Sequence, residues 1–154
     1  MIDTPNILRT ARQMTAVIHV TVPREEIRTV MGPGLSELKA ALAAQVILPT
    51  GPWFTHHLKM DAKTFDFEIG VPVDQAVAVA GRVKPGELPA ATVARTIYHG
   101  PYEGLHTAWR EFSEWILAQG KTCAPSLWET YLTDPEANPD TSTWRTELSR
   151  PLMD

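Results

Sequence analysis

The 154-residue sequence contains one cysteine, Cys123, which cannot form an intramolecular disulfide. Its five histidines are scattered and lack the spacing of zinc ligands, so we expect no metal site and no cofactor. No apolar run approaches the ~18 residues that span a bilayer, and the first residues lack the charged, apolar and small-residue order of a secretory signal. We therefore expect a soluble, cytoplasmic protein without a membrane segment.

Motifs for nucleotide and acyl-transfer chemistry are also missing. The nine glycines are isolated in turns, which disfavours a phosphate-binding loop or a dinucleotide fingerprint. No nucleophile elbow or local triad motif is present. The 14 Lys and Arg residues are dispersed and the formal net charge is -4, so we expect no direct binding of nucleic acid.

The second half of the chain resembles the first. Leu35 and Leu105, Trp53 and Trp128, and Pro72 and Pro151 recur in the same order, separated by 70, 75 and 79 residues. The separation grows only between the expected elements, where loops tolerate insertions. The pattern predicts an α+β fold made by pseudo-twofold duplication of a strand-helix-strand-strand module, with repeats at approximately 13–73 and 91–152 in a single domain of residues 1–154.

Periodicity places the elements of these two modules. Leu35, Leu38, Leu42 and Val46 predict one amphipathic helix, and Leu105, Trp109, Phe112 and Ile116 predict the other. We expect Gly120 to end the second helix, the segment 31–34 to break the chain before the first, and the segment 84–86 to form a turn. β-Rich segments predict strands over 13–21, 53–59, 63–71, 92–98, 128–133 and 144–148, with a valine-rich edge strand over 77–83 and a turn-rich loop over 134–142.

Glu129 is the candidate functional residue. Strand alternation places Glu129 and Tyr131 on one face, and Trp128, Thr130 and Leu132 on the other. If the face of Glu129 is exposed, Glu129 is an ordinary surface residue. If that face lines a cleft between the two halves, a carboxylate among aromatic rings selects cationic, apolar ligands, because burial of an unpaired charge is costly and rings attract cations.

Five tryptophans accompany this carboxylate. We expect Trp109 and Trp115 to pack a helix against the sheet, whereas Trp53, Trp128 and Trp144 are equally compatible with packing and with lining the pocket. Tyr98 and Tyr102 flank the turn at Gly100, where a structural role at the helix entrance is favoured. His56 and His57 are adjacent on a strand and point to opposite faces, so they do not form a metal-binding pair. Glu68 and Glu147 occupy equivalent strand positions, which favours a structural ion pair with Arg95 or Arg145.

Two sets of segments resemble the GyrI-like, or bacterial effector-binding, domain. In the second half the resemblance rests on residues 99–103 (HGPYE), Gly120 and residues 128–135 (WETYLTDP), and in the first half on residues 51–54 (GPWF) and 65–73 (FDFEIGVPV). The resemblance implies an antiparallel sheet with two long helices and a ligand cleft between the halves. It also implies a pocket for drugs, dyes and other xenobiotics in which Glu129 meets cationic ligands.

The resemblance extends to other pocket positions. It implies that Tyr131 and Trp144 line the pocket together with Phe54, and the candidate ligand-binding set is completed by Trp109, Trp53 and His56. The family's tyrosine near His57 is replaced by histidine in this sequence. Relatives of this family form the C-terminal half of AraC-type or MerR-type transcription regulators. Only about a dozen residues precede the first strand here, too few for a helix-turn-helix domain, so we expect a stand-alone copy.

Three functions follow from the resemblance. The leading expectation is a binding protein that senses or sequesters a lipophilic cationic or aromatic small molecule, with no catalytic residue. The second is a hydrolase of reactive cyclopropane-type genotoxins, in which Glu129, Trp109 and Tyr131 act on the electrophile. The third is a protein-interaction role, such as gyrase inhibition or transcription co-regulation, through a protein partner or a homodimer.

Overall fold

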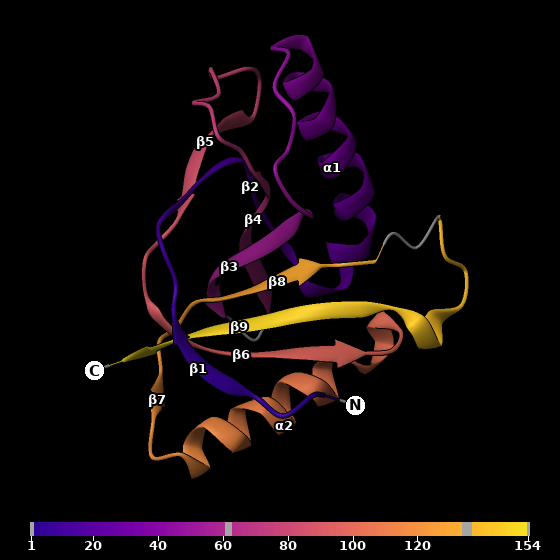
Figure 1. The fold of residues 1–154 in the computed structure, drawn as a ribbon. Helices are drawn as coiled ribbons and strands as arrows, with labels where there is room; N and C mark the ends of the chain where they lie inside the picture. Colours follow the sequence, from indigo (N-terminus) through magenta and orange to yellow (C-terminus); the bar gives the residue numbers. More distant parts are fainter. Residues whose placement is uncertain (1, 61–62, 134–136, 154) are drawn as a thin grey trace. The chain divides into compact units, whose positions relative to one another are not determined.

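The structure, a computed structural model, describes residues 2–60, 63–133 and 137–153. These residues form nine strands and two α-helices, an antiparallel α+β fold (Figure 1). The chain divides into two compact units, which we call the first unit (Ala11–Ala90) and the second unit (Met1–Thr10 with Ala91–Asp154). The prediction of an α+β fold with two helices is confirmed.

The first unit runs strand, helix, strand, strand, and then adds an edge strand. Its elements are β2 (Gln13–Pro23), the 3-10 turn η1 (Arg24–Glu26), α1 (Ile27–Ala44), β3 (Phe54–Met60), β4 (Thr64–Pro72) and β5 (Val83–Leu88). The strands lie in the order β3-β4-β2-β5, and each pair is antiparallel. Helix α1 covers one face of this sheet.

The second unit has the same core order. Its elements are β1 (Asn6–Arg9), β6 (Thr92–His99), η2 (Tyr102–Gly104), α2 (Leu105–Ala118), β7 (Thr122–Cys123), β8 (Leu127–Tyr131), η3 (Thr141–Thr143) and β9 (Arg145–Met153). The main strands lie in the order β1-β6-β9-β8, and β7 pairs with β9. In both units the second strand of the module lies next to the third, and the third lies next to the first. The duplication itself stays a prediction, which this shared order supports.

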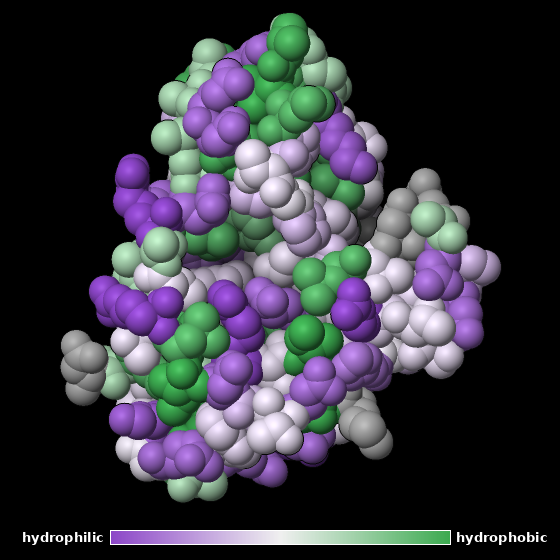
Figure 2. Space-filling model, viewed as in Figure 1, coloured by the Kyte–Doolittle hydropathy of each residue, from purple (hydrophilic) through white to green (hydrophobic). Residues whose placement is uncertain are grey.

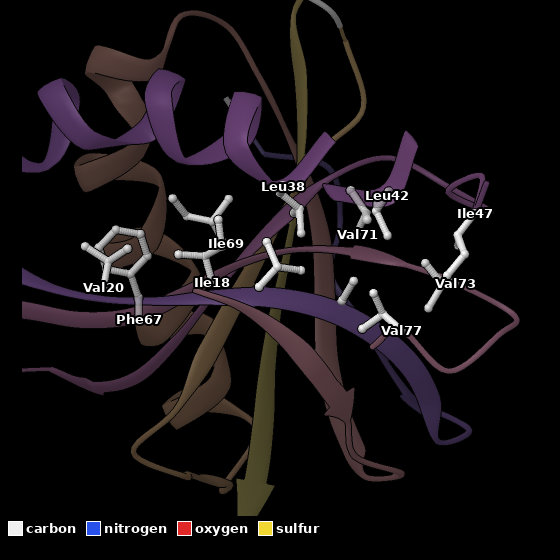
Figure 3. Close-up of a cluster of buried hydrophobic side chains, with 12 residues drawn as sticks. Ile18, Val20, Leu38, Leu42, Ile47, Phe67, Ile69, Val71, Val73 and Val77 are labelled. Carbon is white, nitrogen blue, oxygen red and sulfur yellow. The ribbon is translucent and has the colours of Figure 1, made fainter. Parts of the chain in front are cut away.

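Alternating side chains from β2 and β4 form the core of the first unit. Ile18, Phe67 and Ile69 are fully buried and point toward Leu38 and Leu42 of α1 (Figure 3). Helix α1 approaches β4 closely at Gly34, where an added Cβ would lie 2.6 Å from Ile69 Cδ1. In the second unit, Ala108, Phe112 and Ile116 of α2 pack on Ala94, Tyr98 and Leu148.

The predicted break at residues 31–34 is wrong, because α1 begins at Ile27 and contains Pro33. An internal proline costs a helix about 3 kcal/mol. The apolar stripe, however, continues backward through Ile27, Val30 and Met31, which are partly buried against the core. Burial of a large apolar side chain contributes roughly 1.5–3 kcal/mol when complete, so packing of three such residues offsets the proline.

Other boundaries also differ from the prediction. Residues 84–86 do not form a turn but lie inside β5, where Pro85 pairs with Ala16, and residues 77–79 are not a strand. Strand β5 ends the order of its sheet, and an edge strand tolerates proline because one row of its N–H groups needs no partner. The last strand begins after Trp144 and continues through Pro151, whose carbonyl oxygen accepts a hydrogen bond from the Ala124 N–H at 2.9 Å.

Both helices end in the same motif. After α2, the N–H of Gly120 bonds to the Leu117 carbonyl and the N–H of Lys121 to the Ile116 carbonyl, with Gly120 at φ 74°. This is a Schellman C-cap, as predicted at Gly120. After α1, Val46 and Ile47 bond to the Ala43 and Leu42 carbonyls in the same pattern, and Val46 has φ 56°. Figure 2 shows hydrophobic residues gathered over this end of α1, where Val46 and Leu48 are exposed.

Candidate ligand-binding site

Glu129 lies in β8 and faces α2. Strand register pairs Glu129 with Leu148 and Tyr131 with Thr146 of β9, and Leu148 belongs to the core beneath α2. Glu129 is 9% exposed. The predicted alternation of Glu129 and Tyr131 onto one face is confirmed, and the alternative of a solvent-exposed Glu129 is wrong.

Two neutral donors bind the carboxylate. The Tyr131 hydroxyl donates to Glu129 Oε1 at 2.7 Å, and the Trp109 indole N–H donates to Glu129 Oε2 at 2.5 Å. Trp109 comes from the apolar stripe of α2, and its ring lies 5.7 Å from that of Phe112. Trp109 therefore has both the packing role that the sequence predicted and a polar contact to Glu129 that periodicity did not reveal.

Tyr102 extends the aromatic cluster outward from Tyr131. The ring of Tyr102 lies 5.8 Å from Tyr131, nearly perpendicular to it, and 4.9 Å from Trp144. The turn that carries Tyr102 is fixed by two hydrogen bonds: Tyr98 donates its hydroxyl to the Pro101 carbonyl at 2.8 Å, and the Gly100 N–H donates to the Trp144 carbonyl at 2.9 Å. The sequence favours a structural role for Tyr102 at the helix entrance and does not include it among the candidate ligand-binding residues. The HGPY segment just before α2 was the feature that could have identified it.

Burial governs the electrostatics of Glu129. It raises the pKa of the Glu129 carboxyl, and the hydrogen bonds from Trp109 and Tyr131 lower that pKa by a smaller amount. No Lys, Arg or His within the described ranges forms an ion pair with Glu129. The site is thus a carboxyl group in a dry, aromatic environment that has donors but no resident cation. It can pair with a cation or hold a proton.

The other three candidate residues belong to the first unit. Phe54 is 2% exposed and packs over Gly70, where an added Cβ would lie 2.7 Å from the Phe54 ring. Trp53 immediately precedes β3 and packs against the core of that unit. His56 is buried, with Nδ1 at 3.7 Å from Glu68 Oε1. The structure brings Glu129, Tyr131, Trp109 and Trp144 together, and shows these three residues packed within their own unit.

His57, the neighbour of His56 in β3, is also buried. Its ring stacks on Phe67 at 5.1 Å and meets the edge of Phe65 at 5.4 Å. Burial, together with nearby His56 and Arg24, lowers the pKa of His57 to about 4. Among the residues that the structure describes, no three His, Cys, Asp or Glu side chains are placed to hold a metal ion.

Of Glu147 and Glu68, only Glu147 has the arginine partner that the sequence predicted. Glu147 Oε1 lies 3.4 Å from Arg95 Nε, as predicted, whereas the partner of Glu68 is His56 and not an arginine.

Two hollows of about 300 and 200 Å³ also lie in the second unit, the first beside Gly120 and Lys121 and the second beside Arg95 and Glu147. Glu129 lines neither. No described helix is long and apolar enough to cross a bilayer.

Several solved structures share this fold. The C-terminal domain of EcmrR superimposes with a TM-score of 0.83 at 21% identity, covering 98% of each chain. In the EcmrR–DNA complex the TM-score is 0.81 at 21% identity, and the alignment covers 98% of this chain but only 57% of the EcmrR chain. SAV2435 bound to tetraphenylphosphonium has a TM-score of 0.70 at 14% identity, covering 98% and 94% of the two chains.

A hydrolase from Listeria innocua has a TM-score of 0.66 at 13% identity, covering 97% of this chain and 91% of its own. No curated protein matches the sequence significantly. Residues 10–153, nearly the whole chain, match the family described as the GyrI-like small molecule binding domain. The chain therefore belongs to the GyrI-like small molecule binding domain family.

Proposed function

We propose that this protein binds a lipophilic, cationic aromatic small molecule at Glu129 and acts in sensing or sequestration of such compounds. The observation that carries the proposal is the environment of the Glu129 carboxyl, which is 9% exposed, bonded to Trp109 and Tyr131, and without a cationic partner in the described residues. A buried carboxylate is costly unless a cation accompanies it. A ligand can supply that cation.

The rings around the carboxyl favour the same class of ligand. Trp109, Tyr131, Tyr102 and Trp144 lie within contact of one another or of Glu129. Aromatic faces attract cations by roughly 0.5–2 kcal/mol each and also bury apolar ligand surface. A small inorganic cation is strongly hydrated and has no apolar surface to bury against the rings, whereas an organic cation with aryl groups can contact both the rings and the carboxylate.

A structural neighbour with a bound ligand supports the proposed class of ligand. SAV2435, which shares the fold, was solved with tetraphenylphosphonium, an organic cation with four aryl groups. EcmrR, which also shares the fold, was solved in complex with DNA. Both proteins are less than 25% identical in sequence to this chain. Tetraphenylphosphonium therefore serves here as a probe of the ligand class.

The test is a titration of tryptophan fluorescence with tetraphenylphosphonium and with tetraphenylborate, an anion of nearly the same shape. We expect saturable quenching by the cation only. In Glu129→Gln the affinity for the cation should fall about 30-fold or more, which corresponds to about 2 kcal/mol for loss of a buried charge partner. Glu114→Gln, on the exposed side of α2, is the matched control and should bind like the parent.

The charge role of Glu129 is wrong if the anion binds as tightly as the cation or if Glu129→Gln keeps the parent affinity. Circular dichroism of each variant checks that the fold is intact. Tyr102→Leu and Trp144→Leu test the rings separately, since loss of a cation–π contact should weaken the cation about threefold to tenfold.

A second candidate is hydrolysis of a reactive electrophile at the same site, with Glu129, Trp109 and Tyr131 as the catalytic group. The observation that favours it is the burial of Glu129, which raises the pKa of its carboxyl, because a carboxyl with a raised pKa is better suited to donate a proton as a general acid. Product released from a cyclopropane-bearing electrophile over many turnovers per protein, and lost in Glu129→Gln, would support it. Consumption of only one equivalent would indicate sequestration.

A further inference from the structure

We propose that the Glu129 site exchanges a proton for its ligand: Glu129 is a neutral carboxylic acid in the free protein and releases its proton when a cation binds. This inference rests on the function proposed above and adds its regulation by pH. In the exchange the Oε1–H bond of Glu129 breaks, the proton passes to solvent, and the carboxylate pairs with the incoming cation. No oxidant or other reactant is required.

Charged groups on the helix side do not compensate a negative charge on Glu129. Trp109 is the residue of α2 that contacts Glu129, while His106 and Arg110 on the neighbouring turns of α2 are exposed. Glu103 in η2 is exposed as well and carries the wrong sign to help.

Charged groups on β9 have other partners or point elsewhere. Arg145 is exposed, and Glu147 alternates to the other face, where it lies 3.4 Å from Arg95. Arg150 donates its Nε–H to the Ala124 carbonyl at 3.0 Å. Among the described residues of the second unit, the other titratable side chains near Glu129 are the phenols of Tyr131, Tyr102 and Tyr98, which are neutral at physiological pH. The carboxylate form of Glu129 therefore has hydrogen bonds but no counter-charge.

The hydrogen bonds fit both protonation states. An indole N–H can only donate, so Trp109 always occupies Oε2 as a donor. A phenol both donates and accepts, so Tyr131 can donate to the carboxylate Oε1 or accept the Oε1–H of the neutral acid across the same 2.7 Å. The proton is consequently assigned to Oε1. The change between the two states rotates the Tyr131 hydroxyl, so that its oxygen accepts the Oε1–H and its own hydrogen turns away from Glu129.

Burial without a counter-charge favours the neutral acid over the carboxylate, and it raises the pKa of Glu129. A cation at the site reverses this preference, since an adjacent positive charge favours the carboxylate. Thermodynamic linkage then requires that a fall in pH weakens cation binding.

The experiment measures tetraphenylphosphonium binding between pH 5 and pH 8.5. This probe has a permanent charge and no titratable proton, so any pH dependence belongs to the protein. We expect the affinity to fall up to tenfold per pH unit on the acidic side and to reach a plateau on the alkaline side. Calorimetry in two buffers of different ionisation enthalpy should count up to one proton released per cation on the acidic side.

Two variants act as controls. Glu129→Gln mimics the neutral acid and should show weak, pH-independent binding with no proton release. Glu147→Gln, a partly buried glutamate on the neighbouring strand that faces away from the site, should keep the proton release of the parent. Equal affinity at every pH, or binding with no proton released at any pH, would overturn the exchange while leaving the proposed function standing.

Ligand-free protein tests the first half of the exchange by itself. The δ-carbon resonance of Glu129, assigned by its loss in Glu129→Gln, should titrate above the usual glutamate value of about 4.3. Titration at or below that value would overturn the inference, whatever the binding result. If Glu129 titrates above about 4.3 as expected but tetraphenylphosphonium binds at no pH, the result would instead count against the proposed ligand class.

Discussion

At the scale of single residues, Val46 and Gly120 form a natural comparison. Both occupy the left-handed position of a Schellman cap, Val46 after α1 at φ 56° and Gly120 after α2 at φ 74°. A β-branched residue is strained there, whereas glycine is not. Val46 is 85% exposed, so its side chain gains little from packing. The strain at Val46 is therefore not offset within the described residues.

We expect Val46→Gly to raise the free energy of unfolding by about 1 kcal/mol. The reverse change, Gly120→Val, should lower it by about 1–2 kcal/mol, because an added Cβ there meets no atom within 4 Å and only the backbone conformation is penalised. Urea denaturation of the two variants measures both effects. A loss of stability in Val46→Gly would show that the valine side chain has a stabilising contact.

The lowered pKa of His57 predicts that the free energy of unfolding depends on pH. The pKa of His57 is about 4 in the folded protein and about 6.5 in an unfolded chain. Between these values the unfolded state binds more protons, so the free energy of unfolding falls as the pH is lowered from about 6.5 to 4, by up to about 3 kcal/mol from this residue.

Denaturation at pH 7 and pH 4.5 tests this in the parent and in His57→Phe, which keeps an aromatic ring against Phe67. The loss of stability on acidification should be smaller in the variant. His19→Gln is the control, since His19 is exposed and bonded to Asp66. An unchanged loss in His57→Phe would rule out His57 as the titrating group.

At the scale of elements, the η2 turn positions the aromatic cluster. The ring of Tyr98 packs against this turn. An added Cβ at Gly104 would lie 2.0 Å from the Tyr98 hydroxyl oxygen and 3.0 Å from its ring. Tyr98 is 5% exposed and its hydroxyl is bonded to Pro101, so its ring has little room to move. Any residue larger than glycine at position 104 must displace the turn that carries Tyr102.

We expect Gly104→Ala to lower the free energy of unfolding by about 1–3 kcal/mol, the usual cost of overpacking, and to weaken tetraphenylphosphonium binding at the same time. Gly32→Ala in α1 is the matched control, because its Cβ meets nothing within 4 Å. That variant should stabilise the helix by about 0.5–1 kcal/mol and leave binding unchanged. Gly104→Ala with parent stability and parent affinity would contradict the role of η2.

At the scale of the whole molecule, a ligand that binds only the folded state must raise the melting temperature. At about 100 times its Kd a ligand adds about 2.7 kcal/mol, which for a chain of 154 residues corresponds to roughly 5–10 °C. We expect this shift with tetraphenylphosphonium, a much smaller shift in Glu129→Gln, and none with tetraphenylborate. A shift of equal size for parent and variant would place the probe at a site without Glu129.

Much of this molecule follows from local rules that the sequence alone determines. Strand alternation placed Glu129 and Tyr131 together, the spacing of Phe112 and Ile116 predicted the buried side of α2, and Gly120 predicted its end, because each depends on the geometry of one element. The sequence motifs were also enough to indicate the family that residues 10–153 match.

Only the tertiary structure decided which distant groups meet, because such contacts depend on how elements pack. Packing carried α1 through Pro33, placed Pro85 in an edge strand, and brought the Trp109 indole from α2 to the Glu129 carboxyl 20 residues away. Packing also buries Glu129, which is 9% exposed, and this burial raises the pKa of its carboxyl. A single strand cannot determine this, since desolvation is a property of all the atoms around the group.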